Sequence, residues 1–348
     1  MKTALRWIGF FLALVFLILT FINASWLAPG PRGQVKLIAQ RGVGQLAAPG
    51  SGDCAAARIE PPVHTFLENT VASIQEATRN GAAMIALDVA ATSDGQMVLF
   101  GDETLDCRTD GEGAPGARTL AQLKALDAGY GYTADGGKTF PLRGTGTGAI
   151  PTVQEAVRAA DTKPLVYLFM SDDAKEADLL AAALKAAGRD AVALGDGFFG
   201  GGAPVARIRQ LFPKAWAFSH AEAEACSSGY RRSGWLGIVP DACKGGTLFV
   251  PLNRTWLYAG WPNRLIARME EAGARIIVTA PQGDDDTAPT GLDLPEQIRE
   301  IPVGYNGFVW VDDIWALGPA LHPQYGRRNP AVDEKYEAQL EARRKARE

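Results

Sequence analysis

Short apolar runs alternate along the chain with longer segments in which apolar residues recur every three to four positions. The short runs, bounded by Gly, Pro or Asp, predict β-strands, and the 3.6-residue recurrence predicts amphipathic helices. Strands are predicted at 35–39, 84–89, 97–100, 165–169, 216–218, 247–250, 275–278 and 307–311. Helices are predicted at 71–77, 152–160, 174–187, 205–212 and 264–272. Asp94-Gly95 predicts a tight turn between the second and third strands.

This alternation indicates an α/β fold in which helices cover both faces of a parallel sheet. With about eight such strands, a (β/α)8 barrel of the TIM type is favoured over an open doubly wound sheet. The chain has 348 residues, 47% of them hydrophobic, which is enough to bury the core of one large barrel. Three segments lack the pattern: a long loop at 43–63, a Gly-rich run at 195–202 and a charged tail at 333–348. For the Gly-rich run, a flexible loop is favoured over a phosphate-binding loop. The tail is expected to be a solvated helix or disordered.

The N-terminus predicts a membrane anchor. After Lys2 and Arg6, the stretch 7–22 is apolar throughout, and the next charge is Arg32. This length can span a bilayer, and the two cations favour a cytoplasmic N-terminus. A cleavable signal peptide is the alternative, although 23–26 lacks a small-x-small cleavage site. We therefore expect an anchor and spacer at 1–31, a barrel at 32–330 and the tail at 331–348, with one span in the cytoplasmic (inner) membrane and the barrel on the periplasmic side.

Charge and cysteine content narrow the function classes. The net charge of -4 provides no broad basic surface, so nucleic acid is set aside as a partner. The four cysteines show no C-x-x-C spacing, which argues against a zinc ribbon or a thioredoxin-type motif. An exported domain favours disulfides. Three pairings are possible; we expect Cys54 with Cys107 and Cys226 with Cys243, and four separate thiols remain the alternative.

A collinear series of motifs over 35–127, together with the segment 150–156, resembles the glycerophosphodiester phosphodiesterase family, whose barrel is related to that of phosphatidylinositol-specific phospholipases C. Ile38-Ala39-Gln40-Arg41-Gly42 is similar to the family's I-A-H-R-G motif, and Glu68-Asn69-Thr70 to its E-N-T motif. Ile85-Ala86-Leu87-Asp88-Val89 is similar to I-E-x-D-V, and Gly101-Asp102 through Arg108-Thr109 to H-D-x-x-L-x-R-T. The resemblance implies the TIM-type barrel and a phosphoric diester hydrolase as the family activity.

The departures from these motifs affect the chemistry. The two family histidines that transfer protons correspond to Gln40 and Gly101, and neither side chain can donate a proton near neutral pH. Two carboxylate positions of the family's metal site correspond to Ala86 and, in our alignment, Leu168, which leaves Asp88. A divalent cation such as Ca²⁺ or Mg²⁺ takes about six or more oxygen ligands, so Asp88 alone predicts a weak site and no confident cofactor.

The resemblance places the remaining polar residues around a substrate phosphate, and they are Arg41, Glu68, Asn69 and Asp102. An arginine at a strand end can grip a phosphate bidentately, or it can form a structural salt bridge with Glu68 or Asp88. For Glu68 a cap on the following helix, and for Asp102 a brace within its loop, is slightly favoured over ligand binding. His64 and His220 lie outside the family motifs, and for both a surface or packing role is favoured over catalysis.

Three hypotheses follow. The first is a membrane-anchored, extracytoplasmic family member that has lost most of its catalytic residues and binds a phosphodiester or other polar ligand with little or no hydrolysis. The second is an active hydrolase of glycerophosphodiesters, with a role in lipid or glycerol metabolism, that uses His64 or His220 at a rewired site with Glu68, Asp88 and Asp102 as ligands. The third is a scaffolding protein of the cell envelope.

Overall fold

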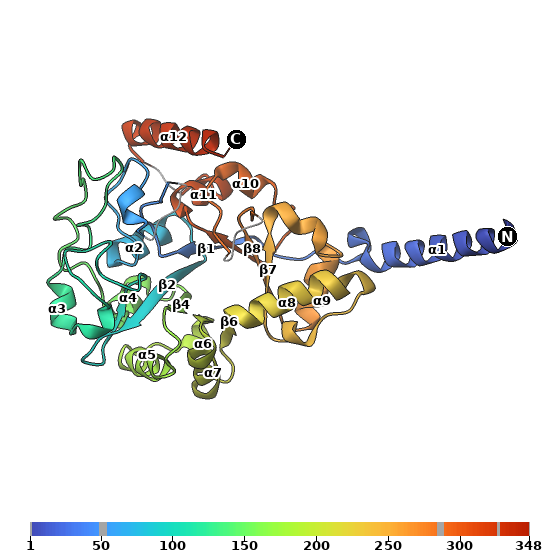
Figure 1. Ribbon diagram of the computed structural model, residues 1–348, viewed down its shortest axis with the longest axis horizontal. Helices are drawn as coiled ribbons and strands as arrows, with labels where there is room; N and C mark the ends of the chain where they lie inside the picture. The colour runs from blue at the N-terminus through green and yellow to red at the C-terminus, as the bar shows by residue number, and fades with distance from the viewer. Residues whose placement is uncertain (1, 49–53, 284–288, 326–327, 348) are drawn as a thin grey trace. The chain divides into compact units, whose positions relative to one another are not determined.

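The computed structural model describes residues 2–48, 54–283, 289–325 and 328–347, and Figure 1 shows its helices and strands. Parallel strands alternate with helices along the chain, which gives the α/β fold of the TIM-barrel type that the sequence predicts. The chain divides into two compact units. Unit 1 comprises 1–36, 221–290 and 299–309, and unit 2 comprises 37–220, 291–298 and 310–348.

Unit 2 contains the parallel strand order β6-β5-β4-β2-β1, with β3 added antiparallel to β2. The strands are β1 (Lys36–Gln40), β2 (Met84–Ala91), β3 (Met97–Leu99), β4 (Leu165–Phe169), β5 (Gly197–Gly200) and β6 (Trp216–Ser219). Nearly every residue of β2 and β4 is buried, because helices cover parallel strands on the outside. The predicted turn at Asp94-Gly95 joins β2 to β3, and Gly95 has a φ of +73°, which favours glycine.

The helices of unit 2 begin at the caps that their sequences provide. Thr70, Thr119 and Thr152 each accept the N3 backbone N–H, and the N3 side chain completes a capping box each time. The helices are α2 (Val71–Arg79), α3 (Leu120–Lys124), α4 (Val153–Ala160), α5 (Lys175–Ala186), α6 (Ala191–Leu194), α7 (Gly202–Leu211), α10 (Pro295–Arg299), α11 (Ile314–Leu321) and α12 (Pro330–Lys345). Short 3-10 turns lie at Ala56–Arg58 and Pro115–Ala117.

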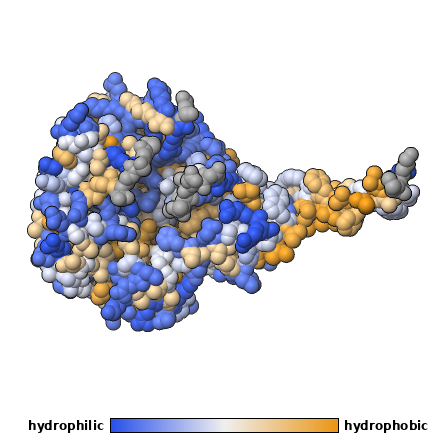
Figure 2. All heavy atoms as spheres, viewed as in Figure 1, coloured by the Kyte–Doolittle hydropathy of each residue, from blue (hydrophilic) through white to orange (hydrophobic). Residues whose placement is uncertain are grey.

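Unit 1 contains the N-terminal helix α1 (Lys2–Asn23) and a parallel pair, β7 with β8, that continues to β9. Its other elements are η1 (Ser25–Leu27), α8 (His220–Ser233), η4 (Gly234–Leu236), η5 (Asp241–Cys243), β7 (Thr247–Pro251), η6 (Leu252–Leu257), α9 (Asn263–Glu271), β8 (Arg275–Thr279) and β9 (Phe308–Val311). The segment Thr3–Asn23 of α1 is long and apolar enough to cross a membrane, and its side chains are exposed. Figure 2 shows this helix coloured as hydrophobic along its length.

The predicted flexible loop at 195–202 is wrong. Residues 197–200 form β5, which is buried and pairs in parallel with β4 and β6. Glycine is needed at position 197 for packing and not for flexibility, because a Cβ there would lie 2.7 Å from Cε3 of the Trp216 ring. The absence of a side chain therefore makes room for an indole on the neighbouring strand.

The charged C-terminal segment is a helix, one of the two predicted alternatives, but it is not solvated on every side. Tyr336, Leu340 and Arg343 of α12 are buried in unit 2. Arg343 donates hydrogen bonds to Glu60 at 2.8 and 2.9 Å and pairs with Asp313 at 2.9 Å. The charges on α12 thus include buried pairs that a sequence pattern cannot distinguish from surface charges.

The cysteine pairing agrees with the expectation. Cys54 is bonded to Cys107 in unit 2, and Cys226 is bonded to Cys243 in unit 1. Part of the predicted 43–63 loop, at 49–53, lies outside the described residues. Its described flanks are held by hydrogen bonds from Ala48 N to Arg58 O at 2.8 Å and from Glu60 N to Leu46 O at 2.9 Å.

Candidate functional site

The site residues that the sequence predicts gather in unit 2 at the carboxyl end of β1, around Asp88 within β2 and just after the antiparallel strand β3. Carboxyl ends of parallel strands meet at one edge of a sheet, so side chains that are distant in sequence come together there. Gln40 closes β1, Asp88 lies on β2, and Gly101 follows β3. Glu68 and Asn69 reach the same place from the segment before α2, and Asp102 from the segment after β3.

Two residues of the site have a left-handed backbone. Arg41 has a φ of +59° and Asn69 has a φ of +58°. Asparagine adopts this region readily, whereas arginine does so at a cost in conformational energy. The Arg41 carbonyl accepts the backbone N–H of Asn69 at 2.9 Å and the Ser73 hydroxyl at 3.2 Å. These hydrogen bonds hold the Arg41 backbone in its strained conformation at the edge of the sheet.

The Asp88 carboxylate is buried and already has a cationic partner. Its Oδ2 atom lies 2.6 Å from Arg41 Nε and accepts a hydrogen bond from Asn69 Nδ2 at 2.8 Å. The Asp88 backbone N–H donates to Asn69 Oδ1 at 3.1 Å. Both polar atoms of the Asn69 amide are therefore used to position Asp88. The charge of Asp88 raises the pKa of the Arg41 guanidinium above its ordinary value.

Gly101 leaves the space that this carboxylate occupies. A Cβ at position 101 would lie 2.0 Å from Asp88 Oδ2 and 3.3 Å from Asn69 Nδ2. Atoms cannot approach so closely, so no side chain fits at position 101 while Asp88 keeps this conformation. The proton-transferring histidine that the family resemblance places here is incompatible with the observed local structure.

Arg108 organises the rest of the acidic cluster, although sequence reasoning did not select it as a site residue. Its NH1 atom pairs with Glu68 and donates to the Tyr132 hydroxyl at 2.8 Å, and its Nε donates to Asp102 at 2.7 Å. Burial alone would raise the pKa of Glu68, but the charge of Arg108 and a backbone hydrogen bond hold it below its ordinary value. Its position six residues after Asp102 in the same motif is the signal that could have found it.

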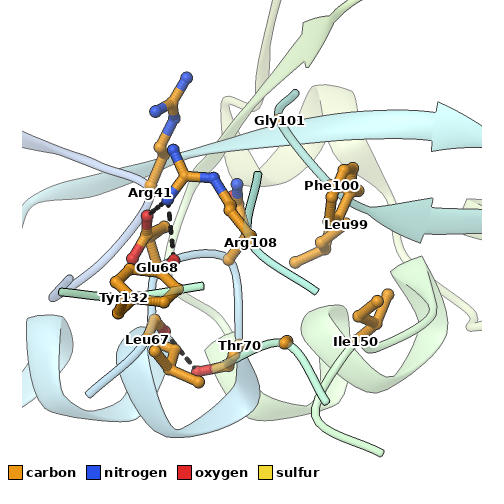
Figure 3. Close-up of a pocket in the computed structure, with 12 residues that line it drawn as sticks. Arg41, Leu67, Glu68, Thr70, Leu99, Phe100, Gly101, Arg108, Tyr132 and Ile150 are labelled. Carbon is orange, nitrogen blue, oxygen red and sulfur yellow. Dashed lines mark hydrogen bonds and ion pairs between the residues drawn. The ribbon is translucent and has the colours of Figure 1, made fainter. Parts of the chain in front are cut away.

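A small cavity lies beside these pairs (Figure 3). It has a volume of about 20 Å³, close to the space that one water molecule needs. The apolar part of its lining is Leu67, Leu99, Phe100, Ala128 and Ile150. In Figure 3 the Arg41 guanidinium points away from the Glu68–Arg108 pair, and the Arg41 side chain is 30% exposed. Arg41 is therefore the cation of the site that solvent or a ligand can reach.

The donor set does not fit a divalent cation as it stands. In the part of the chain that the structure describes, Asp88 Oδ1 has no hydrogen-bond partner, and no group of three or more His, Cys, Asp or Glu side chains is placed to hold a metal ion. Ala86 lies two residues before Asp88 on the same face of β2, and Leu168 is the register partner of Asp88 on β4. Both contribute only apolar atoms where further oxygen ligands would be required.

Aromatic side chains fill the sheet face next to Asp88. Leu168 is in register with Phe199, and Phe199 with Phe218. The rings of Phe199 and Phe218 stack at 4.6 Å between centroids, and Phe218 stacks on Trp216 at 5.1 Å.

Trp310 extends this apolar layer across the face. Its ring lies 6.2 Å from that of Phe199 on β5, and its Nε1 donates to Gln40 Oε1 on β1 at 3.0 Å. Because β4 and β2 lie between β1 and β5, Trp310 must cross the face that carries Asp88. Gln40 thus serves as a hydrogen-bond acceptor for a packed indole.

The two histidines considered for a rewired site occupy apolar surroundings. The His64 ring meets Trp315 edge-on at 4.5 Å and lies 5.4 Å from Phe66, and burial lowers its pKa to about 4. Its Nδ1 lies 3.1 Å from Gln45 Nε2. His64 therefore has the packing role that was favoured from sequence. The His220 ring lies 4.2 Å from that of Phe199, and burial lowers its pKa.

Asp312 is a second site residue that sequence reasoning left aside. It follows directly after β9, within electrostatic reach of Arg41, and its Oδ1 atom is buried without a hydrogen-bond partner among the described residues. Burial raises the pKa of Asp312 to about 7. Burial thus brings the protonation change of Asp312 close to neutral pH. Its sequence signal is an acid immediately after a buried strand.

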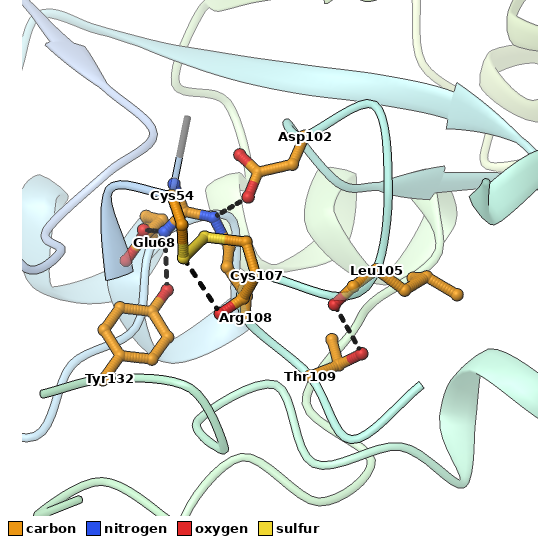
Figure 4. The surroundings of a disulfide bond; sticks show 8 residues. All are labelled: Cys54, Glu68, Asp102, Leu105, Cys107, Arg108, Thr109 and Tyr132. Atoms are coloured by element: carbon orange, nitrogen blue, oxygen red, sulfur yellow. Dashed lines mark hydrogen bonds and ion pairs between the residues drawn. A yellow bond between two sulfur atoms is a disulfide. The ribbon is translucent and has the colours of Figure 1, made fainter. Parts of the chain in front are cut away.

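The Cys54–Cys107 disulfide lies next to the arginine that pairs the acids (Figure 4). Cys107 immediately precedes Arg108, and Cys54 packs with Cys107 against an apolar cluster that includes Leu105 and Tyr132. The covalent link therefore ties the 54–60 segment to the backbone that carries Arg108.

Known proteins match the middle of the chain most clearly. The sequence pattern of the Glycerophosphoryl diester phosphodiesterase family matches residues 55–194, a range that contains Glu68, Asp88 and Arg108. Glycerophosphodiester phosphodiesterase 1 from Rattus norvegicus is 37% identical over 122 residues, which are 35% of this chain and 34% of that protein. The chain matches about a third of the length of the first curated relatives.

Solved structures resemble the fold over a longer range. A glycerophosphodiester phosphodiesterase from Agrobacterium tumefaciens matches with a TM-score of 0.55 at 20% identity, covering 82% of this chain and 99% of the other. The glycerophosphoryl diester phosphodiesterase domain of a Mycobacterium tuberculosis protein matches with a TM-score of 0.57 at 20% identity, covering 82% and 98%. An Oleispira antarctica phosphodiesterase in complex with sn-glycerol-3-phosphate matches with a TM-score of 0.52 at 18% identity, covering 85% and 98%.

These matches confirm the TIM-type fold. The family match at 55–194 includes the segment that supplies Glu68, Asp88 and Arg108. Over residues 55–194 the chain is thus similar in sequence to the glycerophosphodiester phosphodiesterase family, and over about four fifths of its length it has the fold of solved members of that family.

Proposed function

We propose that this protein is a membrane-anchored family member that binds a phosphate-bearing ligand outside the cytoplasm with little or no hydrolysis. The observation that carries the proposal is the position of the Asp88 carboxylate, whose Oδ2 occupies the space that a side chain at position 101 would need. The same carboxylate is paired with Arg41 through Oδ2, which leaves only Oδ1 of Asp88 as a possible metal ligand. Without a proton donor at 40 or 101, departure of the alkoxide lacks general acid catalysis, which is worth about 10² to 10⁴-fold.

The ligand class follows from Arg41. Its Nε faces Asp88, while the exposed side of the guanidinium offers planar donors that match phosphate oxygens. The related Oleispira phosphodiesterase was solved with sn-glycerol-3-phosphate, which makes glycerol phosphates and their diesters the first ligands to test.

Anchoring by α1 and a periplasmic barrel belong to the same proposal. An apolar helix of sufficient length, two disulfides and the flanking cations Lys2 and Arg6 support it. We assign 1–31 to the anchor and spacer, 32–330 to the barrel and 331–348 to the tail. The α12 contacts of Arg343 connect that tail to the barrel domain.

The experiment measures hydrolysis and binding on the full chain in detergent. Turnover of a panel of glycerophosphodiesters is followed with Ca²⁺, with Mg²⁺ and with a chelator, beside the Asp88→Ala variant. We expect no turnover above that variant. Titration calorimetry with sn-glycerol-3-phosphate should show binding that weakens about 10-fold or more in Arg41→Gln, and not in the exposed control Arg79→Gln. Metal-dependent turnover that disappears in Asp88→Ala would overturn the proposal.

An active hydrolase with a rewired site is the second candidate, and Asp312 is the observation in its favour. A carboxyl group with a pKa of about 7 beside Arg41 has the protonation behaviour of a general acid. In this case turnover would be present, would depend on pH near 7, and would disappear in Asp312→Asn. His64 is the weaker source of such a proton, because its ring packs between Phe66 and Trp315.

A further inference from the structure

One arginine of unit 1 fixes the last turn of α1. Arg268 NH1 donates to Asn23 Oδ1 at 3.0 Å and to the Tyr230 hydroxyl at 2.9 Å, while NH2 donates to the Ile22 carbonyl at 3.0 Å. Asn23 Nδ2 in turn donates to the Trp235 carbonyl at 2.8 Å. A cation that satisfies the last carbonyls of a helix also interacts favourably with the helix dipole. The end of α1 is therefore a structured joint within unit 1 and not a loose tether.

Exposed apolar side chains surround this joint. We call them the apolar collar; their exposed fractions run from 44% to 77%, and they are Trp26, Leu27, Trp235, Leu236 and Ile238. The loop after η4 lies against α1, because a Cβ on Gly237 would be 3.0 Å from Ile22 Cγ2. Gly237 also has a φ of +78°, which its turn requires. Large apolar side chains gathered on a surface mark an interaction site.

The collar is continuous with the apolar helix and has the composition of a membrane interface. Tryptophan concentrates where the hydrocarbon core meets the headgroups. Trp7 lies near the other end of α1, and the helical rise from Trp7 to Asn23 is about 24 Å at ~1.5 Å per residue. Trp26 follows within one further turn, so the two tryptophans are separated by nearly the thickness of a hydrocarbon core, about 30 Å.

Cations flank the collar on the polar side. Arg231 and Arg232 form the last turn of α8, directly before η4, and Arg232 is exposed. Basic residues beside apolar ones are attracted to anionic headgroups, by roughly 1 kcal/mol per Lys or Arg near such a surface. We propose that the apolar collar is a lipid-contacting surface that seats unit 1 on an anionic bilayer where α1 leaves it. The proposal rests on the proposed anchoring by α1 and adds a second, peripheral contact to it.

The test places one fluorescent probe on the collar and one away from it. All four native cysteines are in disulfides, so Leu236→Cys and Ala221→Cys each introduce a single reactive thiol. Ala221 is an exposed residue in the first turn of α8, and η4 follows the last turn, about 18 Å further along the helix. Each full-length variant is labelled with NBD and reconstituted into phosphatidylcholine–phosphatidylglycerol vesicles that carry doxyl-labelled lipid.

We expect the 236 probe to shift to shorter emission wavelength and to be quenched at least two-fold by doxyl lipid, with little quenching by iodide. The 221 probe should keep its emission at longer wavelength, be quenched by iodide and be little quenched by doxyl lipid. Flotation of the vesicles after a high-salt wash separates the proposed anchoring by α1 from the proposed collar contact. A chain that fails to float overturns both the anchoring and the collar contact.

Two outcomes overturn the collar contact alone, with the chain still bound to vesicles. In the first, the 236 and 221 probes are equally accessible to iodide. In the second, the 236 probe is protected from both iodide and doxyl lipid, which would mean that a protein surface, such as a second copy of this chain, covers it. Hydrogen exchange of the unlabelled chain provides the second measurement, since lipid contact must slow exchange at 234–238 on transfer from detergent to vesicles.

Discussion

The Asp88 carboxylate and Gly101 share one space, since Asp88 Oδ2 lies 2.0 Å from where a Cβ on Gly101 would be. The two positions are therefore coupled: position 101 can gain a side chain only if the residue at 88 moves or becomes smaller. Because Asp88 also pairs with Arg41 at 2.6 Å, such a movement would expose a buried ion pair.

This coupling predicts a non-additive pair of substitutions. Gly101→Ala should lower the free energy of unfolding by about 1–3 kcal/mol in the wild-type chain, as overpacking does. In an Asp88→Ala background, the same change should cost clearly less, because the colliding oxygen is gone. Urea unfolding followed by tryptophan fluorescence measures all four variants. Gly202→Ala is the matched control, since a Cβ there meets nothing within 4 Å; equal costs of Gly101→Ala in both backgrounds would contradict the prediction.

Removing the Arg108 guanidinium should be among the costliest single changes in unit 2. Arg108→Gln leaves Glu68 and Asp102 without their cation, and breaking a buried pair typically costs about 3–5 kcal/mol. The control is Arg207→Gln in the exposed Arg207–Asp178 pair, where about 0–1 kcal/mol is expected.

The pH dependence of the same variant provides a further check. The pKa of Glu68 is lowered in the folded state, so its stabilising contribution is present above its unfolded value of 4.5 and is lost as the pH falls. The difference between wild type and Arg108→Gln should therefore shrink below pH 4.5. A difference that stays constant down to acid unfolding would assign the cost of Arg108→Gln to packing.

Asp312 predicts the opposite pH trend. Its pKa is raised from 3.8 to about 7, so the folded state retains a proton that the unfolded state has lost. Stability in the wild type should therefore fall as the pH rises between these values and level off above 7. Asp312→Asn removes this penalty, and at pH 8 the variant should be more stable by about 2–4 kcal/mol, with no advantage near pH 4. Thermal unfolding across this range measures the effect; a variant that is less stable at pH 8 would show that the carboxylate is paired.

The two disulfides should differ in their effect on the site. Chain-entropy estimates give about 4 kcal/mol for the Cys54–Cys107 link and about 3 kcal/mol for Cys226–Cys243, because their sequence separations are 53 and 17. Cys54→Ser/Cys107→Ser should also weaken binding of sn-glycerol-3-phosphate, since this link anchors the Arg108 segment. Cys226→Ser/Cys243→Ser is the matched control and should leave binding unchanged. Equal binding in the two double variants would show that the site does not depend on the first disulfide.

The predicted elements agree closely with the observed ones wherever apolar periodicity was strong. Strand 165–169 and helix 153–160 are at or within one residue of their predicted bounds, because each buries a clear apolar face. β5 was missed because its glycines resemble a loop in sequence, whereas the space at Gly197 is filled by Trp216 from another strand. The buried face of α12 was hidden in the same way, since Arg343 reads as a surface charge until Glu60 and Asp313 are seen beside it.

For the candidate site, the sequence indicated which residues lie near one another but not which of them form pairs. The motif order placed Arg41, Asp88 and Gly101 near one another, and the strand ends bring them together. The partners were not visible in the sequence, because Arg41 could equally have paired with Glu68. Arg108 and Asp312 were missed for a different reason: their roles depend on burial and on the groups around them, and neither property is encoded locally.

The stack of Trp216, Phe218 and Phe199 limits how this protein can evolve. Each ring rests on the next, and Gly197 must lack a side chain for the first ring to fit. Introducing a carboxylate at any one of these positions would bury a charge among aromatic rings, and enlarging Gly197 would displace the indole. A polar centre could therefore arise on this face only through several simultaneous replacements, so single mutations would tend to preserve the present interior.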